Sequence, residues 1–257
     1  MSFTSLVLHF AAPLPKLESF QRFLFIGPHP DDIEIGAGAT AAKLTASGKQ
    51  VCFVICTDGR FGSGSAPAGI SADELAALRK SEAIRSAEVL GVRDVRFLDL
   101  SDGALYDTKD LFSRLCAVVS DFQPEVIFAP DPCVDSECHP DHLNVGNAAR
   151  NLACFAPYGD IMRQYGQSAA PVRALAYYMT AKPNAYVNTG STFAKQLSAI
   201  FDCHLSQFPQ DSAASKSIEL YLKLRSLDFG LRSFCAHAEG FRVLGEIHMH
   251  CLPEAGK

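Results

Sequence analysis

The sequence lacks a long apolar run and an excess of basic residues. No stretch approaches the ~18 consecutive apolar residues of a membrane span, and the N-terminal segment lacks the basic start of a secretory signal. Acidic residues outnumber basic ones by 28 to 23, which gives a formal net charge of -5. Such a chain has no general attraction to nucleic acid or to an anionic membrane surface. We therefore expect a cytoplasmic protein that acts on a small molecule.

Several common motifs are also missing. The nine cysteines include no CxxC pair, which excludes a zinc ribbon or CxxC redox site and indicates mostly buried, reduced thiols. No GxSxG is present, so a serine hydrolase of that type is disfavoured. No run rich in Pro, Gly and Ser is long enough to be a linker. We expect a single domain over residues 1–257, with a core at about 22–180 and a less regular portion at about 181–257.

Short apolar runs alternate with helix-forming segments. The runs are typical of strands buried on both faces, and they are Phe23–Gly27, Val51–Cys56, Val95–Leu100, Glu125–Pro130 and Ala174–Met179. Helices are expected over Glu34–Ser47, Ser71–Leu90, Lys109–Phe122 and Leu143–Cys154. Beyond these we expect helices at Ser191–Leu205 and Ser215–Gly230 and a strand at Phe241–Met249. The order predicts an α/β fold, a Rossmann-like, mostly parallel sheet with helices on both faces.

Polar clusters follow three of the predicted strands. The segment PHPDD (Pro28–Asp32) comes directly after the first strand, and TDG (Thr57–Gly59) after the second. HPDH (His139–His142) lies on the loop after the strand that ends at Pro130. Because the carboxyl ends of parallel strands meet at one edge of a sheet, we expect these clusters to lie close together.

The two His/Asp clusters contain the donors of a catalytic zinc site. Such a site takes about three nitrogen or oxygen ligands and keeps one position open. His29, Asp32 and His142 are the predicted ligands. Asp31 is the predicted general base, because a carboxylate beside the metal can take a proton from the attacking water. His139 is the predicted stabiliser of the oxyanion that forms in amide hydrolysis.

Two other interpretations stay open. Gly36–Ala41 reads G-x-G-x-x-A, and Asp58 follows about twenty residues later, as in a dinucleotide-binding fingerprint, which would indicate an NAD or FAD oxidoreductase. In that fingerprint, however, the first glycine follows the strand directly, whereas PHPDDIEI intervenes here. Asp31 and Asp32 could instead cap the following helix. Cys133 and Cys138 flank the second cluster and are expected to be buried, inert thiols rather than ligands.

With these motifs, the sequence resembles the PIG-L/LmbE superfamily of zinc N-deacetylases, and within it the archaeal diacetylchitobiose deacetylase group. The resemblance covers nearly the whole chain. Besides PHPDD, the shared segments are Ile35–Gly38, Cys56–Gly59, Ala129–His142, Tyr177–Asn184, His204–Pro209 and Glu239–Val243.

The resemblance implies hydrolysis of the acetamide of a GlcNAc-containing sugar to amine and acetate. It implies that His29, Asp32 and His142 bind Zn²⁺, that Asp31 is the base and that His139 stabilises the oxyanion. It further implies that Arg79 contacts substrate hydroxyls, with Asp102 as a weaker candidate for the same work, and that the protein forms a trimer or a hexamer. His237, beside the EGFRV segment, is a candidate for lining the substrate pocket.

Two positions depart from the pattern of many members, which have Glu where this chain has Ile33 and Arg60. Neither is a metal ligand, so the departures bear on substrate choice. The Gly- and Ser-rich loop Thr57–Gly69 is expected to be a flap over the site. The segment Phe155–Ala170 is expected to cover the pocket or an interface.

Overall fold

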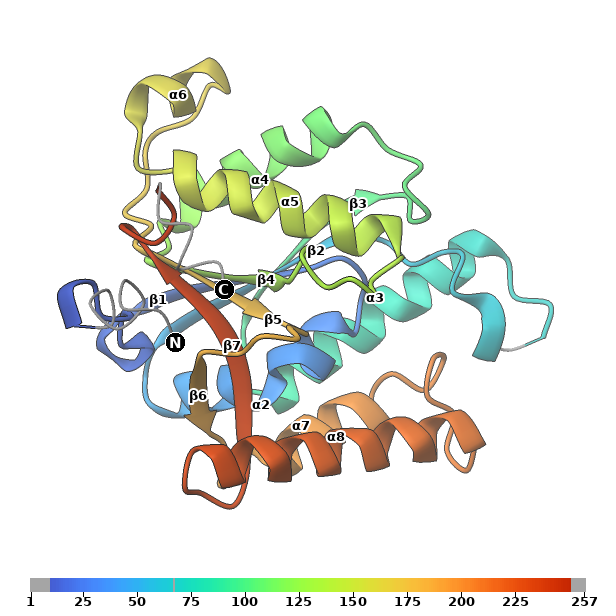
Figure 1. Cartoon of the computed structure of the whole chain (residues 1–257). Coiled ribbons are helices and arrows are strands. Elements are labelled where there is room, and N and C mark those ends of the chain that lie inside the picture. The colour runs from blue at the N-terminus through green and yellow to red at the C-terminus, as the bar shows by residue number, and fades with distance from the viewer. Residues whose placement is uncertain (1–9, 67, 251–257) are drawn as a thin grey trace.

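Within residues 10–66 and 68–250, which the computed structural model describes, seven strands form a sheet in the order β3-β2-β1-β4-β5-β7-β6 (Figure 1). The strands are β1 (Arg22–Gly27), β2 (Gln50–Thr57), β3 (Asp94–Leu100), β4 (Val126–Pro130), β5 (Ala174–Tyr178), β6 (Ala185–Asn188) and β7 (Ala238–Gly245). Strands β1 to β5 pair in parallel, and β7 is antiparallel to β5 and β6. The predicted Rossmann-like, mostly parallel sheet is confirmed.

Helices cover both faces of this sheet (Figure 1). One face carries α4 (Thr108–Phe122) and α5 (Pro140–Phe155), and the other carries α2 (Asp32–Ala46), α3 (Ala72–Val89) and α7 (Phe193–Phe201). The long α8 (Ala213–Arg232) packs on β7, and α6 (Gly159–Gln164) is a short helix. Single 3₁₀ turns lie at Leu17–Ser19 and Ser63–Ser65. No helix within the described ranges has the length and apolarity needed to span a bilayer.

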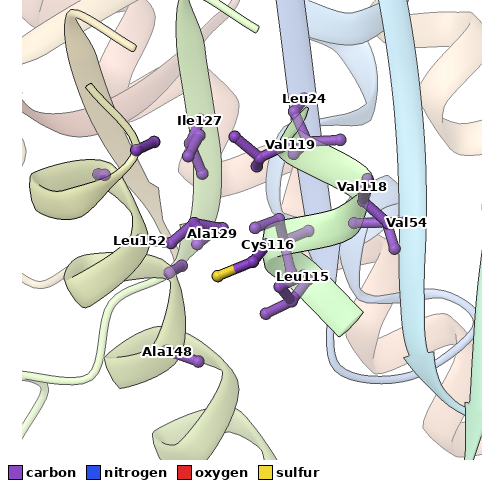
Figure 2. Close-up of a cluster of buried hydrophobic side chains, with 14 of the residues drawn as sticks. Leu24, Val54, Leu115, Cys116, Val118, Val119, Ile127, Ala129, Ala148 and Leu152 are labelled. Atoms are coloured by element: carbon purple, nitrogen blue, oxygen red, sulfur yellow. The ribbon is translucent and has the colours of Figure 1, made fainter. Parts of the chain in front are cut away.

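Both faces of β1 are buried because successive side chains of a strand point to opposite sides. Leu24 and Ile26 join the core beneath α4 and α5, where Figure 2 shows Leu24 near Val119. Phe23 and Phe25 join the core on the α2 and α3 side, and Phe25 stacks on a phenylalanine of β4 at 4.3 Å. This two-sided burial explains the continuous apolar run that predicted the strand.

Helix α5 begins earlier than predicted, and this corrects the placement of HPDH. The helix starts at Pro140 rather than Leu143, with His139 as its N-cap. Proline suits the first helical position, because its fixed φ matches the helix and its missing N–H has no helical partner there. His142 therefore lies on the first turn of a helix rather than on a loop.

Other differences lie in the C-terminal third. Strand β6 was not predicted, because a four-residue strand with one buried position gives no apolar run. Strand β7 begins at Ala238 rather than Phe241 and ends at Gly245. The segment Phe155–Ala170, left without secondary structure by the sequence, contains α6.

A buried glutamate of β7 connects that strand to the first helix. Glu239 accepts hydrogen bonds from the backbone N–H groups of Ala39 (3.1 Å) and Thr40 (2.7 Å) in α2. Gln196 of α7 donates to the carbonyl of Glu34 at 2.8 Å. Burial raises the pKa of Glu239 to about 7, although the two backbone donors oppose the shift. Strand β7 and helix α7 thus hold α2, the helix that begins at Asp32.

This raised pKa makes stability depend on pH. The folded-state pKa of Glu239 lies above the ordinary value of 4.5, so the folded protein favours the protonated carboxyl. The stability that this carboxyl contributes is therefore fully present below pH 4.5 and is lost as the pH rises through about 7. We expect the free energy of unfolding of the native protein, relative to Glu239→Gln, to fall by about 2 kcal/mol between pH 5 and pH 8. Urea denaturation at several pH values measures it. Glu246→Gln, at an exposed glutamate just past the same strand, is the control, and a difference that does not change with pH would contradict the assignment.

Candidate active site

The candidate site lies where the chain leaves β1 and β4, which are neighbours in the sheet. From β1 the chain crosses to β2 on one side, while β4 and β5 lie on the other. Ligand sites of open α/β sheets lie at such a switch point, because the loops after the two strands diverge there. The two His/Asp clusters follow these two strands and meet at this edge.

The turn after β1 is held by its own polar groups. The backbone N–H of His29 donates to Asp32 Oδ2 at 2.8 Å, and the N–H of Asp31 donates to the carbonyl of His29 at 2.9 Å. Asp31 occupies the N-cap position of α2, but its carboxylate turns to Arg79. Neither aspartate therefore caps the helix that follows: Asp32 accepts from the turn before it, and the carboxylate of Asp31 pairs with Arg79.

His29, Asp32 and His142 converge. Asp32 Oδ2 lies 3.0 Å from His29 Nδ1 and 3.3 Å from His142 Nε2. One donor atom from each residue lies within 4.8 Å of the others, which makes this trio a group that could hold a metal ion. Two imidazoles and a carboxylate from two distant segments thus share one small volume.

The second nitrogen of each imidazole faces another carboxylate. His29 Nε2 lies 3.1 Å from Asp141 Oδ2, and His142 Nδ1 lies 2.9 Å from Glu137 Oε2. Metal-binding histidines almost always donate their second N–H in this way, which sets the tautomer and the ring orientation. Neither carboxylate was predicted from the sequence, although Asp141 stands inside HPDH and Glu137 two residues before it.

The surroundings favour positive charge on both imidazoles. Burial works against that charge, but hydrogen bonds to Asp141 and Asp32 raise the pKa of His29 to about 10. Likewise, burial is outweighed at His142 by Asp32 and Glu137, and its pKa rises to about 9. Burial also opposes charge on Asp32, yet the two imidazoles hold its pKa well below the usual range. The cluster is built to stabilise a cation.

His29, His139 and Asp141 form a second group of donors. The oxygens of Asp141, however, already accept hydrogen bonds from the backbone N–H groups of Gly103 (2.7 Å) and Ala104 (2.8 Å). The side chain of His139 is 47% exposed, whereas that of His142 is 15% exposed. The group with Asp32 and His142 is therefore the more enclosed of the two.

Asp31 and Arg79 form a buried ion pair. Arg79 Nη2 lies 3.1 Å from Asp31 Oδ2, and Nη1 donates to the carbonyl of Gly59 at 3.0 Å. Gly59 has φ +68°, and a Cβ atom there would lie 2.4 Å from Arg79 Nη1. The glycine of the TDG segment thus makes room for the guanidinium. Burial raises the pKa of Asp31, while Arg79 opposes the shift.

His139 stands at the open side of the cluster. Its Nδ1 accepts a hydrogen bond from the backbone N–H of Asp141 at 3.3 Å, which leaves Nε2 as the protonated nitrogen of the neutral ring. Burial, and then the neighbouring His29 and His142, lower the pKa of His139. Its ring centre lies 4.7 Å from that of His29. A neutral imidazole therefore presents an N–H donor beside the cluster.

The other predicted residues have different surroundings. Asp102 is buried and accepts from the backbone N–H of Phe61 at 3.2 Å, so it anchors the loop that follows β2. His237 hydrogen-bonds Ser226 of α8 at 2.9 Å and stacks on Phe193 of α7. It packs between two helices rather than joining the cluster.

The expectation that Cys133 and Cys138 are buried is wrong. Both thiols are exposed, because the segment between β4 and α5 runs over the surface, where connecting loops usually lie. The expectation that most cysteines are buried holds in the core of the protein, where Cys52, Cys56 and Cys116 are buried.

A buried polar network behind the cluster was also missed. Glu34 of α2 accepts from Ser86 Oγ at 2.6 Å and lies 3.3 Å from His204 Nε2. Glu82 of α3 accepts two hydrogen bonds from Ser206. His204 and Ser206 belong to the HLSQFP segment, so the network explains why that segment packs against α2 and α3.

The glycines of Gly36–Ala41 serve packing. They lie inside α2, and a Cβ atom on Gly36 would meet the ring of Tyr178 at 2.2 Å. Glycine is thus required for α2 to approach β5. The turn where a pyrophosphate would bind is occupied by His29 and Asp32, and the oxidoreductase alternative is not supported.

Comparisons with known proteins agree with this geometry. The chain is 34% identical to the diacetylchitobiose deacetylase of Thermococcus kodakarensis, with 96% of this chain and 94% of that protein covered. It is 30% identical to a 1D-myo-inositol 2-acetamido-2-deoxy-alpha-D-glucopyranoside deacetylase of Kineococcus radiotolerans, covering 67% of this chain and 55% of that enzyme.

A solved structure gives the same result. The N,N'-diacetylchitobiose deacetylase of Pyrococcus horikoshii, in complex with its inhibitor MPG, superposes with a TM-score of 0.87 at 30% identity, covering 98% of this chain and 97% of that one. The family model described as PIG-L, GlcNAc-PI de-N-acetylase, matches residues 24–153. That range contains both His/Asp clusters and Arg79. The chain therefore belongs to the PIG-L family of de-N-acetylases.

Proposed function

We propose that this protein is a zinc-dependent N-deacetylase that hydrolyses the acetamide of a GlcNAc-containing sugar, such as a chitobiose-like sugar, to amine and acetate. The observation that carries the proposal is the convergence of His29, Asp32 and His142 at the switch point, with a further carboxylate, Asp31, beside them. The names of the relatives support the substrate class, since each is a deacetylase of an acetamido sugar.

The donor set fits zinc. Two imidazole nitrogens and one carboxylate oxygen from His29, His142 and Asp32 would hold the ion, and three such ligands leave a position for substrate or water. Asp141 and Glu137 would orient the two imidazoles. When bound, zinc supplies Lewis-acid chemistry, because it acidifies water and polarises a carbonyl.

The chain's own residues would then move the protons. Asp31 takes a proton from the attacking water as the water oxygen bonds to the acetamide carbon. The Nε2–H of His139 donates to the oxyanion that develops on the carbonyl oxygen. Asp31 then delivers its proton to the nitrogen as the C–N bond breaks, which releases acetate and the amine. The raised pKa of Asp31 suits a group that must hold this proton between the two steps.

Other expectations stay predictions. They are the substrate contacts of Asp102 and His237, the role of the loop after β2 as a flap, the assembly into a trimer or hexamer, and the cytoplasmic location. Within the loop after β2, Arg60 pairs with Asp58 at 2.7 Å, so the arginine that stands where many members have Glu is engaged within the protein.

The activity itself is tested by acetate release. The purified protein should release acetate from N-acetylglucosamine or diacetylchitobiose and contain about one zinc per chain. Asp31→Asn should keep the metal and lose at least about 10³-fold in kcat, since an amide cannot take the proton. His142→Ala should lose both metal and activity. Failure on every acetamido sugar would reject the substrate class, and full turnover by Asp31→Asn would reject the base.

Asp141 should support metal affinity without being a ligand. Asp141→Asn weakens the hydrogen bond that orients His29, so we expect the Kd for zinc to rise by about 10- to 100-fold. Competition with a chelating dye measures this change. Asp135→Asn, at an exposed carboxylate of the loop that precedes α5, is the matched control. An unchanged Kd in Asp141→Asn would show that the carboxylate does not support the ligand.

The role of Arg79 can be determined by measuring the effects of its substitution on kcat and on KM separately. Because its guanidinium is buried against Asp31 and Gly59, we propose that it positions the base. Lysine keeps the charge but lacks the rigid planar fork with which Arg79 meets Asp31 and Gly59, so Arg79→Lys should lower kcat about tenfold or more and leave KM within about twofold. A rise in KM at unchanged kcat would instead show the contact with substrate hydroxyls that the resemblance implies.

A further inference from the structure

The loop after β2 begins with a turn, Gly59–Gly62, that side chains from other elements hold in place. Arg79 donates to the carbonyl of Gly59 at 3.0 Å, and the N–H of Gly62 donates to the same carbonyl at 3.1 Å. Gln207 donates to the carbonyl of Gly62 at 2.8 Å. A Cβ atom on Gly62 would lie 2.5 Å from Arg79 Nη1, so this glycine, like Gly59, lets the turn close around the guanidinium.

Phe61 lies inside this turn and combines an anchored backbone with an exposed ring. Its N–H donates to the buried carboxylate of Asp102 at 3.2 Å, yet the residue is 54% exposed. A single exposed apolar side chain is common on a protein surface. Fixing a loop backbone costs conformational entropy, however, and here the fixed backbone carries a ring that buries little of its own surface. The anchored turn therefore presents the ring in one place.

The ring stands close to the residues that orient His29. A Cβ atom on Gly103 would lie 3.9 Å from Cδ2 of Phe61, so the backbone of Gly103 runs beside the ring. The N–H of Gly103 donates to Asp141 Oδ2 at 2.7 Å, and this oxygen lies 3.1 Å from His29 Nε2. The ring is thus at the rim of the site, next to the cluster of imidazoles and carboxylates but outside it.

A second apolar side chain is exposed on the neighbouring loop. Leu105 is 67% exposed and follows Ala104, whose N–H donates to Asp141 Oδ1 at 2.8 Å. The loops after β2 and β3 are therefore both tied to buried carboxylates at this edge of the sheet, and each exposes an apolar side chain. The rim is apolar where the centre of the site is polar.

This combination of surfaces fits a sugar. The hydroxyl and acetamide groups of a pyranose point outward from its edge, whereas its two faces carry C–H bonds that pack well on a flat aromatic ring. Small-molecule sites combine aromatic side chains of this kind with a few polar groups that fix orientation. The reacting acetamide has to reach His29, Asp32 and His142. A ring at the rim is then placed to meet the next sugar along the chain.

We propose that Phe61 is the stacking surface for the second ring of the substrate, the one linked to the ring that carries the reacting acetamide. The inference rests on the proposed function and adds to it a preference for a disaccharide over a monosaccharide. Because the turn is already ordered, little conformational freedom is lost when the sugar binds. A contact with a ring that does not react is equally strong before and during the reaction, so it lowers KM and leaves kcat nearly unchanged.

The test compares two substrates that differ by one ring. In acetate-release assays, Phe61→Ala should raise the KM for diacetylchitobiose about five- to tenfold with kcat within about twofold, and change the KM for N-acetylglucosamine by no more than about twofold. Phe61→Tyr keeps the flat ring and should retain the wild-type KM for both sugars. Phe61→Leu is apolar without a flat face and should behave like alanine.

Tyr158→Ala is the matched control. Tyr158 is a similarly exposed aromatic residue, at 48%, and lies beyond the end of α5 that is remote from His142. Its KM values should equal those of the wild type, and circular dichroism and Tm establish that each variant is folded.

Three kinetic results would overturn the inference about Phe61. They are an unchanged KM in Phe61→Ala, an equal rise in KM for both sugars, which would place the ring against the reacting sugar, and a fall in kcat alone, which would show a disturbance of the metal site through Gly103. Calorimetric titration with diacetylchitobiose needs no turnover, so it separates this inference from the proposed function. If the wild type releases no acetate, the proposed function fails, and equal affinity of the wild type and Phe61→Ala for the sugar would reject the stacking contact as well.

Discussion

The parallel pairing of β1 with β4 is the constraint on which the rest of the structure depends. Phe23, Leu24 and Phe25 align with residues 126–128, although more than 100 positions separate them along the chain. Because both strands end at the same edge, His29 and His142 can share a carboxylate. The apolar side chains on both faces of these strands therefore have a functional role, since they set the separation of two segments that carry polar groups.

The balance of charge at this edge links the fold to the chemistry. Asp31, Asp32, Asp141 and Glu137 lie around two imidazoles, and the only arginine that these contacts include, within the described residues, is Arg79. Buried carboxylates are costly unless paired with positive charge. Either doubly protonated imidazoles or a metal ion supplies that charge. In the proposed function, a metal ion bound by the two neutral imidazoles would supply that charge and leave Asp31 to accept a proton.

The sequence predicted the parts of this site that follow strand ends and left out those that depend on side-chain direction. His29, Asp32 and His142 could be placed together because parallel strands share an edge. The roles of Asp141 and Glu137 could have been suspected from the need of metal-binding histidines for a second partner. The direction in which the Arg79 side chain points could not be predicted, because it depends on the space that Gly59 leaves. Strand β6 was missed because an edge strand needs only one buried residue.

Helix α8 shows a second limit of prediction from sequence: the helix could be predicted, but not which of its faces is buried. An apolar residue every three or four positions predicts a helix, and it was predicted close to its actual bounds. With leucines on two faces, however, the pattern alone cannot decide which face meets the sheet. That was decided by β7, whose Gly240 admits the ring of Phe229 and so selects the inner face. Within the described residues, the leucines of the opposite face, Leu220, Leu224, Leu227 and Leu231, are left exposed.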